Sequence, residues 1–259
     1  MSTLTQEEAQ LISDSVSRFV AENYRFEHRE KRLKEFPFGL QWAKFAELGW
    51  LALPLNETVG GLGASLDDMS GILMAFGCGL VEEPYLDGIV LAAEIVERLG
   101  THEQRDQILP AIATGERRLC LCHRESGSEL VNDDIHTSFR NEGSTYVING
   151  RKSMAFAAAW ADTLLVSARS DTEIAIFLVS AKSPGLLLRS FPCADGSQAA
   201  DVEFRSVEVD AGMRLGGADI LDAWPVLKRS LLRGAAAVCM EAVGIAQALR
   251  VITADYLKV

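Results

Sequence analysis

The hydrophobic positions of this chain recur with two different periods, and the changes of period divide it into three regions. From Thr5 to about Arg118, apolar residues lie three and four positions apart, as on one face of an amphipathic helix. From Leu119 to about Val209, short β-prone runs alternate with Gly, Asn, Asp, Ser and Pro. Helical spacing returns from Asp222 to Val259. We therefore predict an α+β protein with an all-helical N-terminal domain at 1–118, a middle antiparallel β-barrel at 119–212 and the first helix of a C-terminal helical bundle at 213–259.

The first region predicts several helices joined by short turns. Thr5 and Glu8 form a capping box before an amphipathic stripe, and Ser65 and Asp68 form a second box. Further helices are expected at 40–48, 86–99 and 103–113. Three glycines at 60, 61 and 63 lack the preceding strand and the spacing of a dinucleotide-binding loop. They predict a turn between helices with closely packed backbone.

The second region contains β-prone runs without helices between them, which is typical of an antiparallel barrel or sandwich. Asn149-Gly150 lies between two such runs and predicts a tight hairpin turn, with Arg151-Lys152 starting the return strand. The runs lie at 119–122, 135–140, 146–148, 163–168, 174–179, 186–189 and 202–209.

The last helix is apolar on more than one face, so it must be buried against partners. It reaches Lys258-Val259 without a glycine cap, a proline or a polar tail. We therefore expect that the sequence is truncated at its C-terminal end.

Composition and charge exclude several classes of protein. With 259 residues and 48% hydrophobic content, the chain can bury a sizeable core. Its net charge is −11 and its acidic residues are scattered, so no basic face for nucleic acid or anionic lipid is expected. The N-terminus resembles no signal peptide, and no apolar run reaches about 18 residues. We expect a soluble cytoplasmic protein without nucleic-acid or membrane partners.

Cysteine and histidine positions predict no metal site. Five cysteines are an odd number, which argues against a disulfide framework. Cys120 and Cys122 would lie on one face of a strand, and no second pair stands at zinc spacing, so we expect them to be buried thiols. The four histidines are dispersed and are assigned neither a ligand nor a base role.

Two motifs carry a family resemblance. The run Glu57-x-x-Gly-Gly-x-Gly63 precedes, by about 90 residues, a strand motif made of Gly150, Lys152, Ala161, Asp162, Ala168 and Arg169. Both motifs and their order resemble the acyl-CoA dehydrogenase family, and the resemblance covers essentially all 259 residues. It implies FAD as cofactor and an acyl-CoA substrate. In that family a glutamate removes the α-proton of the thioester while the flavin accepts the β-hydride.

The resemblance also identifies the positions that would contact FAD, and they have lost the family's residues. The signature Thr-Glu-Pro-Gly-x-Gly-Ser-Asp aligns with 123–131, where Glu125 and Gly127 persist. A gapped alignment, with 127–129 standing for Gly-Ser-Asp, is the alternative. Thioether and phenyl groups cannot replace the hydroxyl donor of the second flavin motif. The cofactor positions implied by the family are His123, Arg124, Leu130, Met154, Ala155 and Phe156.

The catalytic glutamate of the family is missing from this sequence. Family members place it either in a later part of the chain or at the position of Gly234 or Ala235. Glu241 is the only carboxylate of this helix before Asp255, and two turns, roughly 10 Å, separate it from that position. We expect a solvated or structural role for Glu241. No catalytic residue is therefore assigned.

A run at 80–86 and a His-x-Glu sequence at 123–125 resemble the small subunits of heteromeric enzymes such as pimeloyl-CoA dehydrogenase. The leading hypothesis is a subunit of a heterotetrameric flavoprotein of fatty acid metabolism. A paralogous large subunit, or self-association, would complete its site and supply the base. A non-catalytic scaffold subunit and an inactive truncated fragment are the alternatives.

Overall fold

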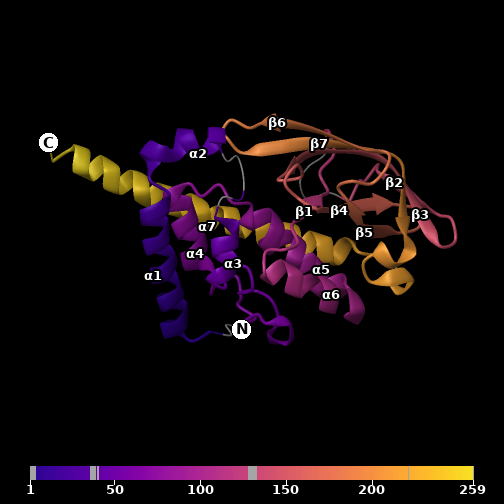
Figure 1. Ribbon diagram of the computed structural model, residues 1–259, viewed down its shortest axis with the longest axis horizontal. Coiled ribbons are helices and arrows are strands. Elements are labelled where there is room, and N and C mark those ends of the chain that lie inside the picture. The colour runs from indigo at the N-terminus through magenta and orange to yellow at the C-terminus, as the bar shows by residue number, and fades with distance from the viewer. Residues whose placement is uncertain (1–3, 36–38, 40, 128–132, 221, 259) are drawn as a thin grey trace.

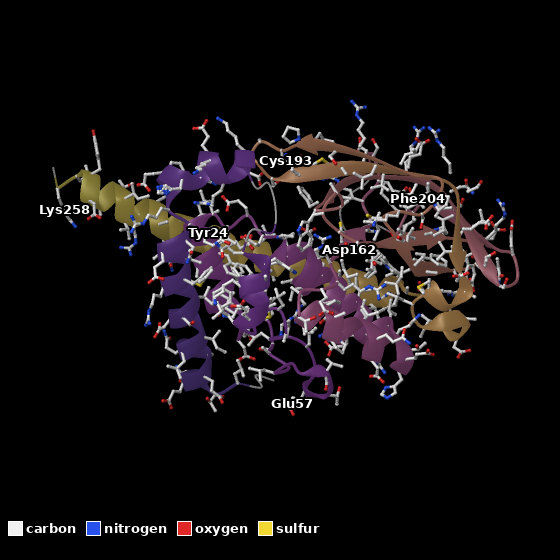
Figure 2. All side chains as sticks on the ribbon, viewed as in Figure 1. Tyr24, Glu57, Asp162, Cys193, Phe204 and Lys258 are labelled. Carbon is white, nitrogen blue, oxygen red and sulfur yellow. The ribbon has the colours of Figure 1, made fainter. Side chains whose placement is uncertain are left out.

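The computed structural model describes residues 4–35, 39, 41–127, 133–220 and 222–258. Figure 1 shows a group of helices beside a curled β-sheet, with the long helix α7 running alongside both. The side chains of the helices and of the sheet fill the space between these layers (Figure 2). The expected sequence of helical region, β region and long helix is confirmed.

The helices lie where spacing and capping predict them. Thr5 caps α1, and both hydrogen bonds of its capping box with Glu8 form. The box of Ser65 and Asp68 also forms, but it caps a turn, since α4 begins only at Ser70. The helices before the sheet are α1 (Gln6–Asn23), η1 (Phe26–His28), α2 (Arg29–Glu35), α3 (Trp42–Glu47), η2 (Glu57–Val59), α4 (Ser70–Gly79), η3 (Leu86–Ala93), α5 (Glu94–Leu99) and α6 (His102–Ala113).

The glycine-rich segment at 60–63 is the closely packed turn that the sequence predicts. Gly60 has φ +85°, and a Cβ on Gly61 would lie 1.9 Å from the carbonyl oxygen of Leu55. The backbone N–H of Gly61 donates a hydrogen bond to the carbonyl oxygen of Asn56. The expected helix at 86–99 starts as a π-helix, η3, and continues as α5. Wide turns of this kind occur often at functional sites.

The sheet differs from a wholly antiparallel barrel. It is a curled mixed sheet, a half-barrel, in which β1 pairs with β4 in parallel, whereas the β3–β7, β4–β5 and β6–β7 pairs are antiparallel. β1 and its neighbour β4 are too far apart in sequence to form a hairpin, because β2 and β3 lie between them along the chain. The strands are β1 (Leu119–Cys122), β2 (Ser138–Asn141), β3 (Thr145–Phe156), β4 (Thr163–Arg169), β5 (Ile174–Ser180), β6 (Leu186–Pro192) and β7 (Gln198–Asp210).

The hairpin turn predicted at Asn149-Gly150 is wrong. β3 continues through both residues, and the turn before it closes where the N–H of Glu142 donates to the carbonyl of Thr145. Asn149 lies at a bulge between β3 and β7, where its side chain accepts a hydrogen bond from the N–H of Ser206. Gly150 has φ +146° and leaves no room for a Cβ, which would lie 2.6 Å from the Cα of Thr137. A bulge and a turn use the same residue types, so local sequence did not separate them.

The helix α7 (Trp224–Tyr256) packs one side against α4 and leaves the other side exposed. Its end passes beyond α1 and α2, as the position of Lys258 in Figure 2 shows. The sequence predicts that α7 needs partners for its apolar surface, and the described chain leaves part of that surface exposed. Its exposed apolar residues are Leu232, Val238, Val243, Ile245, Leu249, Val251, Ile252, Tyr256 and Leu257.

By length and composition, α7 could cross a membrane, because its most apolar 18-residue window has a mean hydropathy of 1.6. Charged residues, among them Glu241, interrupt the apolar residues of this helix, so no uninterrupted apolar run marks it in the sequence. The core helix of a bundle passes the same test.

Candidate functional site

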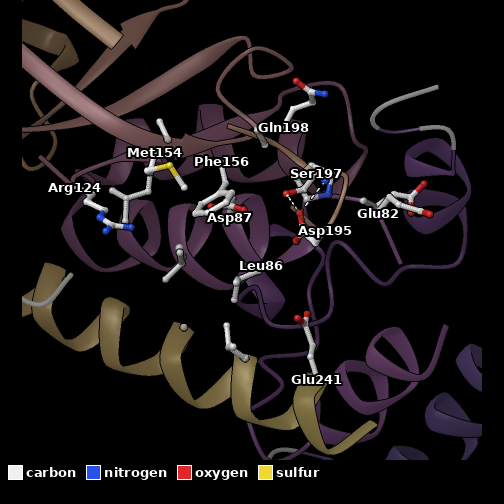
Figure 3. Close-up of a pocket in the computed structure, with 18 of the residues that line it drawn as sticks. Glu82, Leu86, Asp87, Arg124, Met154, Phe156, Asp195, Ser197, Gln198 and Glu241 are labelled. Atoms are coloured by element: carbon white, nitrogen blue, oxygen red, sulfur yellow. Dashed lines mark hydrogen bonds between the residues drawn. The ribbon is translucent and has the colours of Figure 1, made fainter. Parts of the chain in front are cut away.

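A cavity of about 660 Å³ lies between η3, the end of β3, the tip of the β6–β7 hairpin and α7 (Figure 3). Five of the six predicted cofactor positions line this one cavity, although they come from separate segments. Leu130 lies outside the described residues. The five that the fold brings together are His123, Arg124, Met154, Ala155 and Phe156.

The end of β3 is bent so that two of its side chains enter the cavity. A bulge interrupts the β3–β7 register between Lys152 and Ala155, and Met154 and Ala157 have φ of +53° and +59°. Such left-handed residues are uncommon outside glycine and mark locally strained backbone. Because of this bend, Met154 and Phe156 project into the cavity in Figure 3.

A buried ion pair holds the segment that follows β1. Lys152 Nζ lies 2.7 Å from Glu125 Oε1, 3.0 Å from the carbonyl oxygen of His123 and 3.1 Å from Ser167 Oγ. Glu125 Oε1 also accepts from the N–H and the hydroxyl of Thr137. The Lys152 side chain has no exposed surface. This network positions Arg124 at the cavity, because it anchors the residues on both sides of it.

Both members of the pair have shifted pKa values. Burial by itself raises the pKa of Glu125, but the Lys152 ammonium and the Thr137 hydrogen bonds outweigh it and lower that pKa to about 2. Burial lowers the pKa of Lys152 to about 8, although Glu125 opposes this shift. Both groups are therefore charged at neutral pH. Glu125 and Lys152 are among the motif residues that the sequence retains.

Two carboxyl groups that sequence reasoning did not assign also line the cavity. Asp87 comes from η3 and Glu241 from α7. Burial raises the pKa of each to about 7, and the charge of Glu241 adds to the shift at Asp87. A solvated or structural role is expected for Glu241, and the structure places its carboxyl at the cavity (Figure 3). Helical spacing could have indicated it, since Leu231, Gly234, Val238 and Glu241 share one face of α7.

The family's alternative position for the base lies inside the same cavity but holds no proton acceptor. Gly234 and Ala235 both line it. A Cβ on Gly234 would lie 2.6 Å from Leu91 Cδ2, so the side chain of Leu91 occupies the adjacent space. The described chain therefore provides no carboxylate at that point of the cavity.

The tip of the β6–β7 hairpin closes the cavity toward α2. Arg29 Nη2 donates to the carbonyl of Asp195 at 2.7 Å, and its Nε lies 3.7 Å from Glu82 Oε1. Ser197 Oγ donates to Asp195 Oδ1 at 2.7 Å. Among the described residues that line the cavity, Ser197 carries the only hydroxyl side chain, and its hydrogen is used within the hairpin.

The family's hydroxyl donor to the polar edge of a flavin ring is missing from the cavity wall, where Arg124 and Gln198 are the side chains that could donate instead. Met154 and Phe156 offer no donor, and the Ser197 hydroxyl is engaged. Across the described ranges, no group of three or more His, Cys, Asp or Glu side chains could hold a metal ion. Cys120 and Cys122 are free and buried in β1, as expected.

Comparisons with known proteins agree with this architecture. The profile "Acyl-CoA dehydrogenase, N-terminal domain" matches residues 6–116, and "Acyl-CoA dehydrogenase, middle domain" matches 119–207. Acyl-CoA dehydrogenase FadE27 of Mycobacterium tuberculosis is 28% identical over 179 residues, which are 69% of this chain and 47% of that protein. The chain spans about half the length of the curated relatives it matches.

Two solved structures resemble the whole fold. The ChsE4-ChsE5 complex from Mycobacterium tuberculosis matches with a TM-score of 0.84 and 27% identity, over 99% of this chain and 68% of the matched chain. A variant of the Tcur3481-Tcur3483 steroid ACAD matches with a TM-score of 0.85 and 26% identity, over 97% and 67%. With both domain profiles matched in order on the expected fold, this chain belongs to the acyl-CoA dehydrogenase family.

Proposed function

We propose that this chain is one subunit of a heteromeric acyl-CoA dehydrogenase. It contributes a pocket for the acyl group of an acyl-CoA thioester, and a paralogous partner subunit supplies the catalytic base and most contacts to FAD. The reaction is the FAD-dependent α,β-dehydrogenation of the thioester. The observation that carries the proposal is the cavity beside α7, which lies at the family's positions but lacks the family's base and hydroxyl donors.

Two further observations support a partner. The similar structures include the ChsE4-ChsE5 complex and the Tcur3481-Tcur3483 steroid ACAD, each named for two different chains. The C-terminal half of α7 carries Val243, Leu249 and Ile252, which are 48%, 58% and 64% exposed. Exposed apolar side chains gathered on one part of a molecule mark an interaction surface.

A non-catalytic scaffold subunit is the second candidate. Gly234, Met154 and Phe156 favour it, because none of them can move a proton or donate a hydrogen bond to a flavin. The two candidates differ in one measurable property. A scaffold subunit has no reason to bind acyl-CoA, whereas the proposed subunit binds it through the cavity.

Acyl-CoA oxidation by these 259 residues alone is expected to be undetectable, because neither Gly234 nor Ala235 can act as a base. The assay uses an artificial electron acceptor, a series of acyl-CoA thioesters and, in parallel, calorimetric binding of the same thioesters. Binding without turnover supports the proposal, and its partner should then restore turnover. No binding in the assembled complex favours the scaffold. Turnover by the isolated chain that disappears in Glu241→Gln would contradict the assignment of the base to a partner.

Restoring a hydroxyl at residue 156 is expected to increase flavin retention. Phe156→Thr places a donor where the phenyl ring now lies, 38% exposed in the cavity, and one unsatisfied flavin acceptor costs about 1–3 kcal/mol. The measurement is the flavin absorbance per protein after gel filtration of the complex. Leu187→Thr on β6, away from the cavity, is the control. Equal retention in both variants would mean that the missing hydroxyl is not what limits flavin binding.

A further inference from the structure

The cavity is apolar along most of its walls but carries two carboxyl groups that the proposed chemistry does not use. Asp87 from η3 and Glu241 from α7 both face it. Leu86, Leu91 and Val238 line the wall around them. The two elements are far apart in sequence, so the carboxyl groups share the cavity only because α7 packs across η3.

Neither carboxyl group has a cationic partner. Across the described part of the chain, no ion pair and no hydrogen bond from another side chain reaches Asp87 or Glu241, and burial is the largest influence on the pKa of each. Other acidic groups near the cavity are engaged: Glu82 pairs with Arg32, and Asp195 accepts from Ser197. Asp87 accepts a hydrogen bond from its own backbone N–H, and both side chains are partly exposed to the cavity, so whatever fills the cavity decides how their remaining hydrogen-bonding capacity is met.

Water can hydrate these groups in the empty cavity, but an alkyl chain cannot. A saturated acyl tail that fills the cavity expels that water, which leaves Glu241 without a hydrogen-bond partner and Asp87 with only its own backbone N–H. Each unsatisfied buried group weakens binding by about 5- to 150-fold. A site built to bond a hydroxyl therefore discriminates strongly against the analogue that lacks it.

We propose that Asp87 and Glu241 select an acyl group whose tail carries a hydroxyl, and that the pair binds this hydroxyl inside the cavity. The inference rests on the proposed acyl-binding function and names its substrate class. A hydroxyl both donates and accepts, so it can bond a carboxyl group at the cavity wall whether that group is ionised or protonated. The apolar walls bind the remainder of the tail.

The test compares matched thioesters on the full chain in its complex. Calorimetry measures the dissociation constants of ω-hydroxyacyl-CoA probes, from 8-hydroxyoctanoyl-CoA to 12-hydroxydodecanoyl-CoA, and of alkyl acyl-CoA probes one carbon longer. At the length that reaches the pair, the hydroxyl probe should bind at least about fivefold more tightly. Glu241→Met and Asp87→Leu should each remove this preference. Asp255→Asn, at the exposed end of α7, should keep it.

The variants also have a readout that is independent of ligand. Because water hydrates both carboxyls in the empty cavity, Glu241→Met and Asp87→Leu should not lower the melting temperature, so a misfolded variant, whose melting temperature falls, is distinguished from a binding variant. If alkyl and hydroxyl probes bind equally, or if Glu241→Met keeps the preference, the substrate class is wrong while acyl-CoA binding stands. If no thioester binds, the proposed function fails and the inference fails with it.

Discussion

Lys152→Met is expected to lower the free energy of unfolding by about 3–5 kcal/mol, because it leaves the carboxylate of Glu125 buried without its counter-ion. The Lys152 ammonium also bonds the carbonyl of His123 and the hydroxyl of Ser167, so these groups lose a donor as well. Urea unfolding followed by circular dichroism measures the change.

The neighbouring residue supplies a matched control. Arg151 pairs with Glu203 at 3.0 Å but its side chain is 79% exposed, so Arg151→Met should cost no more than about 1 kcal/mol. The double variant Glu125→Gln with Lys152→Met should recover part of the loss, since no buried charge remains unpaired. Equal effects of Lys152→Met and Arg151→Met would show that the buried pair is not a major source of stability.

The same ion pair implies an acid-dependent stability. The pKa of Glu125 lies at about 2 in the folded chain, below its ordinary value of 4.5. Its contribution is therefore fully present above pH 4.5 and is lost as the pH falls toward 2. In Lys152→Met the carboxyl loses the ammonium that lowers its pKa, so stability should fall less steeply across this range.

Gly77→Ala and Gly244→Ala are each expected to lower the free energy of unfolding by about 1–3 kcal/mol. A Cβ on Gly77 would lie 2.0 Å from the carbonyl oxygen of Glu241, and a Cβ on Gly244 would lie 1.9 Å from that of Met74. Both obstacles are backbone atoms, so α4 and α7 must move apart. Alanine is a better helix former than glycine by about 1 kcal/mol. A net loss of stability in these variants would therefore arise from the crossing of α4 and α7.

The crossing also positions the cavity, so a second measurement follows. When α7 moves away from α4, the carboxyl of Glu241 moves with it, and acyl-CoA binding should weaken together with stability. Gly212→Ala is the control, because no atom lies within 4 Å of its Cβ position. Stability and binding that are unchanged in Gly77→Ala would show that the two helices tolerate a wider separation.

Local sequence determined the elements and their order. Capping by Thr5 and Glu8, the run at Thr163–Arg169 and the change from helical to strand spacing near Leu119 depend on residues close together in the chain. Each signal arises from the backbone's own periodicity, which neighbouring residues reveal. The family motifs could be recognised for the same reason, because each lies within one short stretch of the sequence.

Local sequence patterns did not predict the features of the site that depend on pairing between distant segments. The bulge before Ala155 exists because β7 pairs with β3 on both sides of it. The residues at 149–150 are as typical of a hairpin turn as of the bulge that they form. The parallel partner of β1 is β4, more than 40 residues away. No local pattern reports such a register, since it is set by contacts across the sheet.

The sequence by itself determined the family, the three-part order of elements and the absence of the family's base at Gly234. Tertiary structure alone decided that Asp87 and Glu241 face one cavity and that one side of α7 remains exposed. From its residue type alone, a carboxylate on a helix is predicted to be solvated, because most glutamates are exposed. Whether it is buried depends on what packs opposite, and here η3 and the end of β3, remote in sequence, enclose it.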